Sequence, residues 1–192
     1  LTRIRLAAAM LEPGPETEGI ARDAGEMERM LDAFLDFVRG QTGEASEAVD
    51  PFAFAAAAAQ DARRNGAEIE LCERREGGGE VTLRPSAMRR CLANLIDNAC
   101  HHGMRVRLTT RLTAAGCEFL VEDDGPGIPA ERREEALRPF TRIDSSRNQD
   151  RGSGVGLGLA VALDLARSHG GSLTLEDSAD LGGLRAAVRL PR

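Results

Sequence analysis

The spacing of apolar residues over the first forty positions limits the possible folds more than any other feature of this sequence. Apolar side chains recur in alternating steps of three and four between Leu1 and Leu11, and again between Ile20 and Val38. Such steps place apolar side chains along one side of a helix and are typical of coiled coils and helix bundles. The helix breaker Glu12-Pro13-Gly14-Pro15 separates the two segments. The pattern therefore predicts an antiparallel helical hairpin over residues 1–41.

A hairpin of this length buries too little apolar surface to be stable alone. We therefore expect two copies to associate into a four-helix bundle, which makes the protein a homodimer. The alternative is that the hairpin packs on the rest of its own chain. Residues 42–50 are mostly small and polar, and they predict a linker to a second domain.

Residues 51–192 are expected to form that second domain. Asp50-Pro51 provides an N-cap and a first helical residue. We expect helices over 51–65, 85–102 and 158–169, and strands over 68–73, 81–84, 105–112, 118–121, 172–175 and 184–190. A short helical piece is expected near 131–137. Because repeated βαβ units are missing, this order favours an α+β or mixed sandwich fold.

All 25 basic residues are arginine, and the lack of lysine excludes several classes of enzyme. It excludes the phosphate-binding loop that ends in Gly-Lys-Ser/Thr, the lysine-dependent Ser/Thr/Tyr kinases and any Schiff-base mechanism. A net charge of −6, with no Trp and no Tyr, argues against nucleic acid as a partner. The four cysteines form no C-x-x-C pair, which favours reduced thiols in a cytoplasmic protein over a zinc site.

The ends of the chain and its hydropathy give a further expectation. No apolar run approaches the roughly 18 residues of a membrane-spanning helix, and no signal peptide is recognisable. Because the first residue is Leu rather than Met, we interpret the chain as a soluble piece of a longer protein.

Two amides share one face of the expected helix 85–102. Asn94 and Asn98 are four residues apart, and His101 and His102 follow one turn further along. Amide oxygens are suitable ligands for a hard cation such as Mg²⁺. Taken alone, an asparagine pair of this kind is more often part of a solvated helix surface.

A second cluster, Asp123-Asp124-Gly125-Pro126-Gly127-Ile128, follows the expected strand 118–121. Glycines allow the backbone to approach a flat ligand closely. The carboxylate of Asp123 can accept a hydrogen bond from an exocyclic amine such as that of adenine. Taken alone, Asp-Gly-Pro-Gly is an ordinary turn.

Glycines occupy every second position of a third cluster, Gly152-Ser153-Gly154-Val155-Gly156-Leu157-Gly158, directly before the expected helix 158–169. Exposed amides at a helix N-terminus form a binding site for phosphate. The spacing differs from the dinucleotide fingerprint, because its third glycine would fall at Leu159.

The polar segment between the second and third clusters predicts a mobile lid. Phe140 would be its apolar anchor, and Arg147 would be available to phosphates. For each arginine taken alone, a solvated loop charge is the simpler explanation.

Together and in this order, the clusters are far more specific than any one of them. The sequence resembles the cytoplasmic core of a bacterial two-component sensor histidine kinase of the osmolarity-sensor type. The residues similar to the N, G1, F and G2 boxes of that family are Asn94–Ala99, Asp123–Gly127, Pro139-Phe140 and Gly154–Ala160. The resemblance implies an α+β fold, with a dimerisation hairpin over 1–41 and an ATP-binding domain over 51–192. That domain would be a sandwich of a mixed sheet and three helices, the Bergerat fold shared with gyrase-type ATPases.

The resemblance also implies which residues bind ATP and Mg²⁺. Asn98 would be the metal ligand, Asn94 a polar contact nearby, and Asp123 the acceptor for the adenine amine. Arg147 would reach the γ-phosphate, and His101 would lie near the phosphates. The other ATP-binding residues that it implies are Gly125, Gly127, Ile128, Phe140, Gly154, Gly156, Leu157 and Gly158.

The activity implied is transfer of the γ-phosphoryl group to a hairpin histidine, and then to an aspartate of a response regulator. The phosphoacceptor of the family precedes a segment similar to Leu1–Leu6, so we expect no catalytic histidine within this chain. His101, His102 and His169 all lie in the nucleotide-binding half. The resemblance further implies the cytoplasmic portion of a bacterial inner-membrane sensor, which contacts the membrane only through upstream segments.

Three alternatives stay open at this point. A gyrase-type ATPase is disfavoured, because such relatives carry a glutamate four residues before the metal-binding asparagine, where this chain has Asn94. A nucleotide-binding dimerisation scaffold without kinase activity fits the missing acceptor. A serine kinase of the anti-sigma type shares the nucleotide boxes but lacks a comparable hairpin.

Overall fold

The computed structural model describes residues 44–141, Ile143 and 156–192, together with isolated residues between Met10 and Met27. The chain divides into two units, Leu1–Thr42 with Ser146–Val155 and Gly43–Ser145 with Gly156–Arg192. In the first unit, the described residues from Thr17 to Met27 have helical backbone. Apart from these residues and the isolated Met10 and Gly14, the expected hairpin over 1–41, and with it the expected dimerisation, lies outside the described residues.

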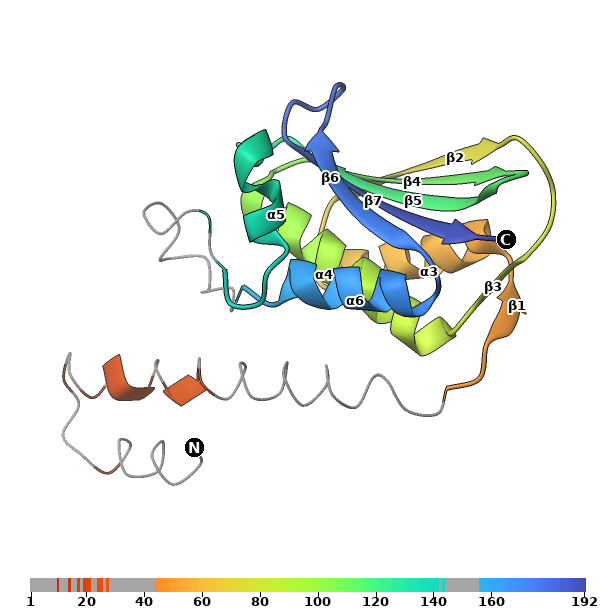
Figure 1. Ribbon diagram of the computed structural model, residues 1–192. Helices are drawn as coiled ribbons and strands as arrows, with labels where there is room; N and C mark the ends of the chain where they lie inside the picture. Colours follow the sequence, from red (N-terminus) through yellow and green to blue (C-terminus); the bar gives the residue numbers. More distant parts are fainter. Residues whose placement is uncertain are drawn as a thin grey trace. The chain divides into compact units, whose positions relative to one another are not determined.

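The second unit contains a five-stranded mixed sheet with the strand order β2-β4-β5-β7-β6 (Figure 1). Its strands are β2 (Ile69–Arg75), β4 (Val106–Thr113), β5 (Gly116–Asp123), β6 (Ser172–Asp177) and β7 (Leu184–Pro191). β2 and β4 are parallel, and the other neighbouring pairs are antiparallel. Because β5 and β7 are antiparallel and Glu122 pairs with Arg185, the end of β5 lies beside the start of β7.

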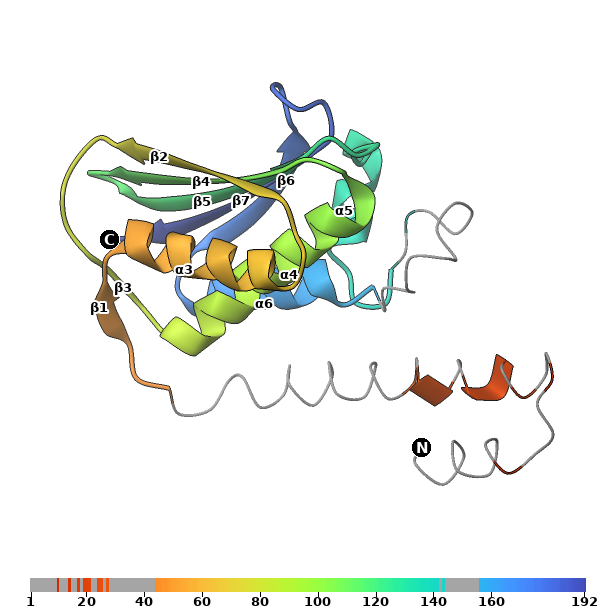
Figure 2. The ribbon, with the colours of Figure 1, turned by 180° about the vertical axis from the view of Figure 1, so that it is seen from behind.

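Three helices cover one face of this sheet, namely α3 (Pro51–Arg64), α4 (Pro85–His102) and α6 (Gly158–Ser168) (Figures 1 and 2). At the start of α3, the side chain of Asp50 accepts a hydrogen bond from the amide of Phe52 at 2.9 Å, as an N-cap does. Pro51 and Pro85 each occupy the first turn of their helix, where a missing amide proton costs no helical hydrogen bond.

The apolar core lies between the sheet and these helices. Leu108 of β4, Phe119 of β5 and Val188 of β7 are fully buried on the face toward the helices. Leu92 and Leu95 of α4 are buried as well. Side chains on the opposite side of α4 are therefore fixed in direction, because their helix cannot rotate without exposing this core.

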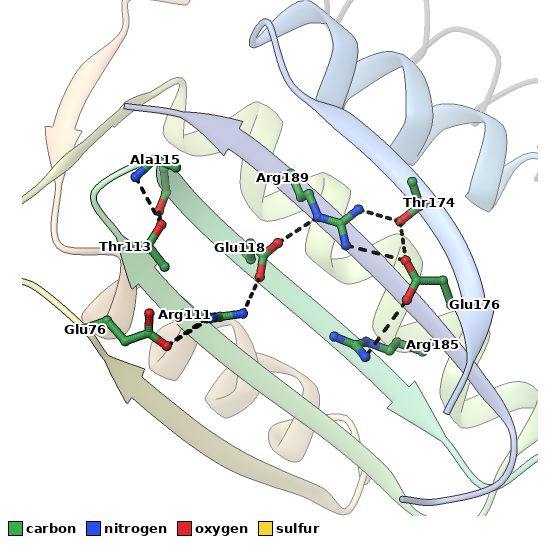
Figure 3. Close-up of polar contacts among 10 residues, drawn as sticks. Glu76, Arg111, Thr113, Ala115, Glu118, Thr174, Glu176, Arg185 and Arg189 are labelled. Atoms are coloured by element: carbon green, nitrogen blue, oxygen red, sulfur yellow. Dashed lines mark hydrogen bonds and ion pairs between the residues drawn. The ribbon is translucent and has the colours of Figure 1, made fainter. Parts of the chain in front are cut away.

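The opposite face of the sheet carries a ladder of charged side chains across its strands (Figure 3). Glu118 of β5 is central, since its carboxylate lies 2.7 Å from Nε of Arg189 and 3.7 Å from Nη1 of Arg111. Glu76 and Glu176 extend the ladder at its two ends. The ladder covers this face with paired charges rather than with a second layer of helices.

The expected helices and strands of the second domain are present, with their ends shifted by a few residues. The short helical piece is divided into η1 (Ala130–Arg132) and α5 (Arg133–Ala136). The expected linker 42–50 contains an element that the sequence did not predict, strand β1 (Glu47–Val49), which pairs antiparallel with β3 (Val81–Leu83). β3 was expected over 81–84, whereas the small and polar residues around β1 favoured a linker.

Candidate functional site

The carboxylate of Asp123 is the best-defined polar group at the end of β5. Its side chain is 2% exposed, and Oδ1 accepts hydrogen bonds from the amides of Gly125 at 2.8 Å and Leu184 at 3.2 Å. Burial raises the pKa of Asp123, although these two hydrogen bonds and the charge of His102 act in the opposite direction. The buried carboxylate is therefore held in place by two backbone amides, and His102 supplies a positive charge nearby.

Glycines surround Asp123 because no Cβ would fit there. A Cβ on Gly183 would overlap the side-chain oxygen of Asp123, and one on Gly125 would lie 2.7 Å from the carbonyl oxygen of His102. A Cβ on Gly103 would lie 2.9 Å from the Cβ of Asp123. Such distances are far below ordinary carbon contacts. The end of α4, the end of β5 and the start of β7 therefore meet directly at this carboxylate.

Hydrogen bonds within the loop between β6 and β7 hold the backbone directly before Leu184 in place. The hydroxyl of Ser178 donates to the carboxylate of Glu122 at 3.0 Å and accepts from the amide of Leu181 at 3.1 Å. Both Ser178 and Glu122 are buried. The amide of Ser178 also donates to the carbonyl of Gly183 at 2.8 Å. This tight loop fixes the residues that contact Asp123, and the sequence analysis did not identify it.

The carboxylate of the next residue, Asp124, has a different structural role. Oδ1 of Asp124 accepts hydrogen bonds from the amides of Met104 at 2.7 Å and Arg105 at 2.9 Å. These bonds lower the pKa of Asp124. Asp124 thus holds the turn that follows α4, whereas Asp123 lies at the buried junction.

Helix α4 carries the two asparagines at the border of its buried side, since Asn98 follows the buried Leu95 by three residues. Asn94 and Asn98 are both half-buried, and the side-chain amide of neither residue makes a hydrogen bond within the described part of the chain. The rings of His101 and His102 meet edge to face, with their centroids 4.9 Å apart. The close approach of Gly103 to Asp123 brings this end of α4 to the carboxylate.

The start of α6 lies close to α4 at Asn94. A Cβ on Gly158, its first residue, would lie 3.7 Å from the carbonyl oxygen of Asn94. The preceding residue, Leu157, is buried and anchors this helix start. The N-terminal amides of α6 therefore lie next to the asparagine face of α4.

Phe140 and Gly156 connect the two described ends of the expected lid. The amide of Phe140 donates to the carbonyl of Gly156 at 2.9 Å. Both residues have positive φ, 64° and 72°, and Phe140 is 60% exposed. A Cβ on Gly156 would lie 2.6 Å from the carbonyl oxygen of Thr141, so only glycine fits. Arg147 and Gly154, which the sequence analysis also assigned to the site, lie outside the described residues.

Gly127 and Ile128 continue the loop after β5. Gly127 has a φ of 69°, and a Cβ there would lie 3.6 Å from the backbone of Gly183. The carbonyl of Ile128 accepts a hydrogen bond from Nε of Arg133 at 3.0 Å. This loop is therefore held by backbone contacts and by one arginine of α5.

The side chains near Asn98 suit a cation that takes most of its ligands from water and from a bound phosphate group. Within the described residues, no group of three or more His, Cys, Asp or Glu side chains could hold a metal ion. The amide oxygen of Asn98 is a neutral, partly accessible ligand of the kind that Mg²⁺ accepts, and Mg²⁺ commonly keeps water and phosphate oxygens in its remaining positions. The residues present therefore fit Mg²⁺ bound together with a nucleotide.

Comparisons with known proteins show the family of this chain. Residues 83–192 match the family described as histidine kinase-, DNA gyrase B- and HSP90-like ATPases. Sensor histidine kinase GtrS of Pseudomonas aeruginosa is 34% identical, covering 100% of this chain and 39% of GtrS. Sensor histidine kinase CpxA of Escherichia coli is 31% identical, covering 100% of this chain and 44% of CpxA. The chain thus spans about two fifths of the length of these curated relatives.

Two solved structures are similar at comparable identity. The ATP-binding domain of PrrB from Mycobacterium tuberculosis has a TM-score of 0.60 and 30% identity, covering 76% of this chain and 96% of that one. The histidine kinase domain of the Escherichia coli osmosensor EnvZ has a TM-score of 0.57 and 30% identity, covering 78% of this chain and 89% of that one.

Within the described residues, no helix has both the length and the apolar character needed to cross a membrane.

Proposed function

The chain belongs to the histidine kinase-, DNA gyrase B- and HSP90-like ATPase family as a sensor histidine kinase catalytic core, and from this membership we propose that it binds ATP with Mg²⁺ and donates the γ-phosphoryl group to a histidine. The acceptor would lie on a helical hairpin, upstream of Leu1. The phosphoryl group would then pass to an aspartate of a response regulator.

The observation that carries this proposal is the buried carboxylate of Asp123. Burying a carboxylate costs free energy, and a ligand that donates a hydrogen bond to it recovers part of that cost. The exocyclic amine of adenine is such a donor. Oδ1 already accepts two backbone amides, which fixes the direction of the second oxygen before any ligand binds.

The phosphates would lie between α4 and the start of α6. The N-terminal amides of α6, which begins at Gly158, favour negative charge, as does the helix dipole. Asn98 would hold Mg²⁺, which neutralises phosphate charge when bound. Gly154 and Arg147 would complete the phosphate contacts, and His101 and Phe140 would lie at the edges of the site.

Asn94 favours phosphoryl transfer over hydrolysis. Activation of a water molecule requires a general base at this distance from the metal ligand, and an amide cannot take up a proton. Phosphoryl transfer depends mainly on alignment and charge neutralisation. In the proposed step, the bond between Pγ and the β,γ-bridging oxygen breaks, a bond between Pγ and a histidine nitrogen forms, and ADP leaves.

His169 is unsuitable as the acceptor. Its Nδ1 lies 2.7 Å from the carbonyl of Leu165, and its Nε2 accepts the amide of Arg84 at 3.0 Å. Because both ring nitrogens are engaged in structural hydrogen bonds, neither is available to attack a phosphoryl group.

The remaining parts of the proposal concern the whole protein. The acceptor hairpin would form a homodimer, and the partner would be a response regulator rather than a nucleic acid. The chain would be the cytoplasmic portion of a bacterial inner-membrane sensor.

Radiolabelled ATP tests the reaction directly. We expect this chain, mixed with a hairpin that carries the phosphoacceptor histidine, to transfer label from the γ-position in the presence of Mg²⁺. The phosphorylated product should be acid-labile, as a phosphohistidine is. Nucleotide binding without transfer would instead favour a dimerisation scaffold. Steady release of phosphate without an acceptor would favour a gyrase-type ATPase.

A further inference from the structure

Helix α4 begins with an N-cap that its own sequence does not provide. The N-cap residue, Arg84, makes no capping hydrogen bond with its side chain. Instead, the carboxylate of Glu44 accepts the amides of Ser86 at 2.6 Å and Ala87 at 3.0 Å. Two amides of the first turn, which have no partner within the helix, are thus satisfied by a residue 42 positions earlier in the chain.

The backbone that follows Glu44 is attached to the same place. β1 pairs with β3, with Glu47 opposite Leu83 and Val49 opposite Val81. β3 leads directly into Arg84 and α4. Residues 44–49, the entering segment, lead the chain into this domain. They are therefore joined to the start of α4 by both a backbone ladder and a side chain.

The end of α6 meets α4 at the same point. The amide of Arg84 donates to Nε2 of His169 at 3.0 Å. The guanidinium of Arg84 donates to the carbonyl of Ser168 at 3.1 Å and to its hydroxyl at 2.5 Å. Because α6 starts beside Asn94 and ends at Arg84, both helices of the nucleotide site are connected to the junction that Glu44 caps.

The charge of Glu44 suits this position. Burial alone would raise its pKa, but the hydrogen bonds from Ser86 and Ala87 and the charge of Arg84 together lower it. The carboxylate is therefore ionised at neutral pH, and it faces the positive end of the α4 dipole.

We propose that Glu44 is a positioning residue for the nucleotide site, which connects the entering segment to the helix that carries Asn94 and Asn98. When the entering segment holds Glu44 against α4, the first turn is ordered and the asparagine face is preorganised. When that segment moves and withdraws the carboxylate, α4 loses its cap and the affinity for nucleotide falls. This inference rests on the proposed function, since it assigns a means of regulation to the same site.

A pair of glutamate variants tests the proposal in the whole 192-residue chain. Glu44→Ala removes the cap, and Glu44→Gln retains one acceptor oxygen. Glu47→Ala is the matched control, because Glu47 is exposed on the same segment and its side chain makes no hydrogen bond or ion pair within the described residues. Hydrogen exchange of the α4 amides and titration with an unhydrolysable ATP analogue and Mg²⁺ are measured on each.

We expect Glu44→Ala to speed exchange at Ser86 and Ala87 about fivefold, as loss of an N-cap does, and to weaken nucleotide binding about fivefold. The exchange rates and nucleotide affinity of Glu44→Gln should lie between those of Glu44→Ala and the unsubstituted chain. Glu47→Ala should match the unsubstituted chain in both measurements. Faster exchange with unchanged nucleotide affinity would overturn the proposal and leave Glu44 a structural cap only. Equal effects from Glu47→Ala would overturn it too. If the unsubstituted chain binds no nucleotide, the proposed function itself fails.

Discussion

The carboxylate oxygen Oδ1 of Asp123 and the amide nitrogen of Leu184 lie 3.2 Å apart, although 61 residues separate them in the chain. The first ends β5 and the second begins β7, and antiparallel pairing of these strands holds the two together. The orientation of the proposed adenine acceptor is therefore a property of the folded sheet.

We predict that Asp123→Asn weakens binding of an ATP analogue by at least tenfold. The asparagine oxygen can still accept the amides of Gly125 and Leu184, so the fold is retained. Its amide group then presents a donor where adenine requires an acceptor. Calorimetric titration measures the loss, and circular dichroism checks that the helix content is unchanged.

Asp124→Asn is the matched control for that substitution. Its oxygen can continue to accept the amides of Met104 and Arg105. Nucleotide affinity should change by less than about twofold. Equal losses at both positions would mean that the two aspartates affect the loop rather than the ligand.

Gly183→Ala should disrupt the same junction through size alone. The new methyl group would overlap the side-chain oxygen of Asp123 and lie 2.5 Å from the amide nitrogen of Gly125. Overpacking of this kind costs about 1–3 kcal/mol. We expect a lower free energy of unfolding and weak nucleotide binding. Gly78→Ala, where nothing lies within 4 Å of the added Cβ, should leave both unchanged.

The sequence predicted the elements of this domain well but not the contacts between them. Asn94, Asn98 and Asp123 were identifiable because helical spacing and a glycine-rich strand end are local signals. The loop from Ser178 to Gly183 carried no such signal, because its role depends on strand order in the sheet. The pair Gly182-Gly183 before the last strand was the one local sign of a close approach.

The Glu44 cap is a second case in which tertiary structure decides. An N-cap is normally sought within the few residues before a helix, and there the sequence has Leu83 and Arg84. The capping carboxylate comes instead from a segment that was predicted to be a linker. Pairing of β1 with β3 brings it there, and a pairing between strands that lie about 30 residues apart has no local signal in the sequence.

The pH dependence of adenosine binding should follow Asp123. Its pKa lies above the ordinary 3.8 because the carboxylate is buried. The free protein therefore gains stability as the pH falls through that raised pKa, whereas an adenine amine requires the ionised form. We expect adenosine affinity to decrease as the pH is lowered from 7 toward 4.5. Adenosine is used as the ligand because it lacks phosphates, whose own titration would also change the affinity over this pH range.

The same titration with Asp123→Asn provides the comparison. Without an ionisable group at this position, its weak affinity should be independent of pH over that range. Adenosine binding that strengthens on acidification would contradict the assignment of Asp123 as an ionised acceptor.

Glu118→Gln should destabilise the outer face of the sheet by about 1 kcal/mol. The carboxylate separates the guanidinium groups of Arg111 and Arg189, and the neutral amide leaves two like charges close together (Figure 3). Denaturant unfolding measures the cost, which should shrink at high salt because screening weakens the repulsion. Glu134→Gln on exposed α5 is the control. A cost that does not vary with salt would argue against the charge ladder as its cause.

Titration of the unsubstituted chain with an unhydrolysable ATP analogue, with and without Mg²⁺, tests the central claim most directly. The account predicts binding that becomes tighter when Mg²⁺ is present, because Asn98 and the phosphates would share the cation. Absence of binding in both conditions would contradict it, and a scaffold that does not use nucleotide would then be the better explanation of this fold.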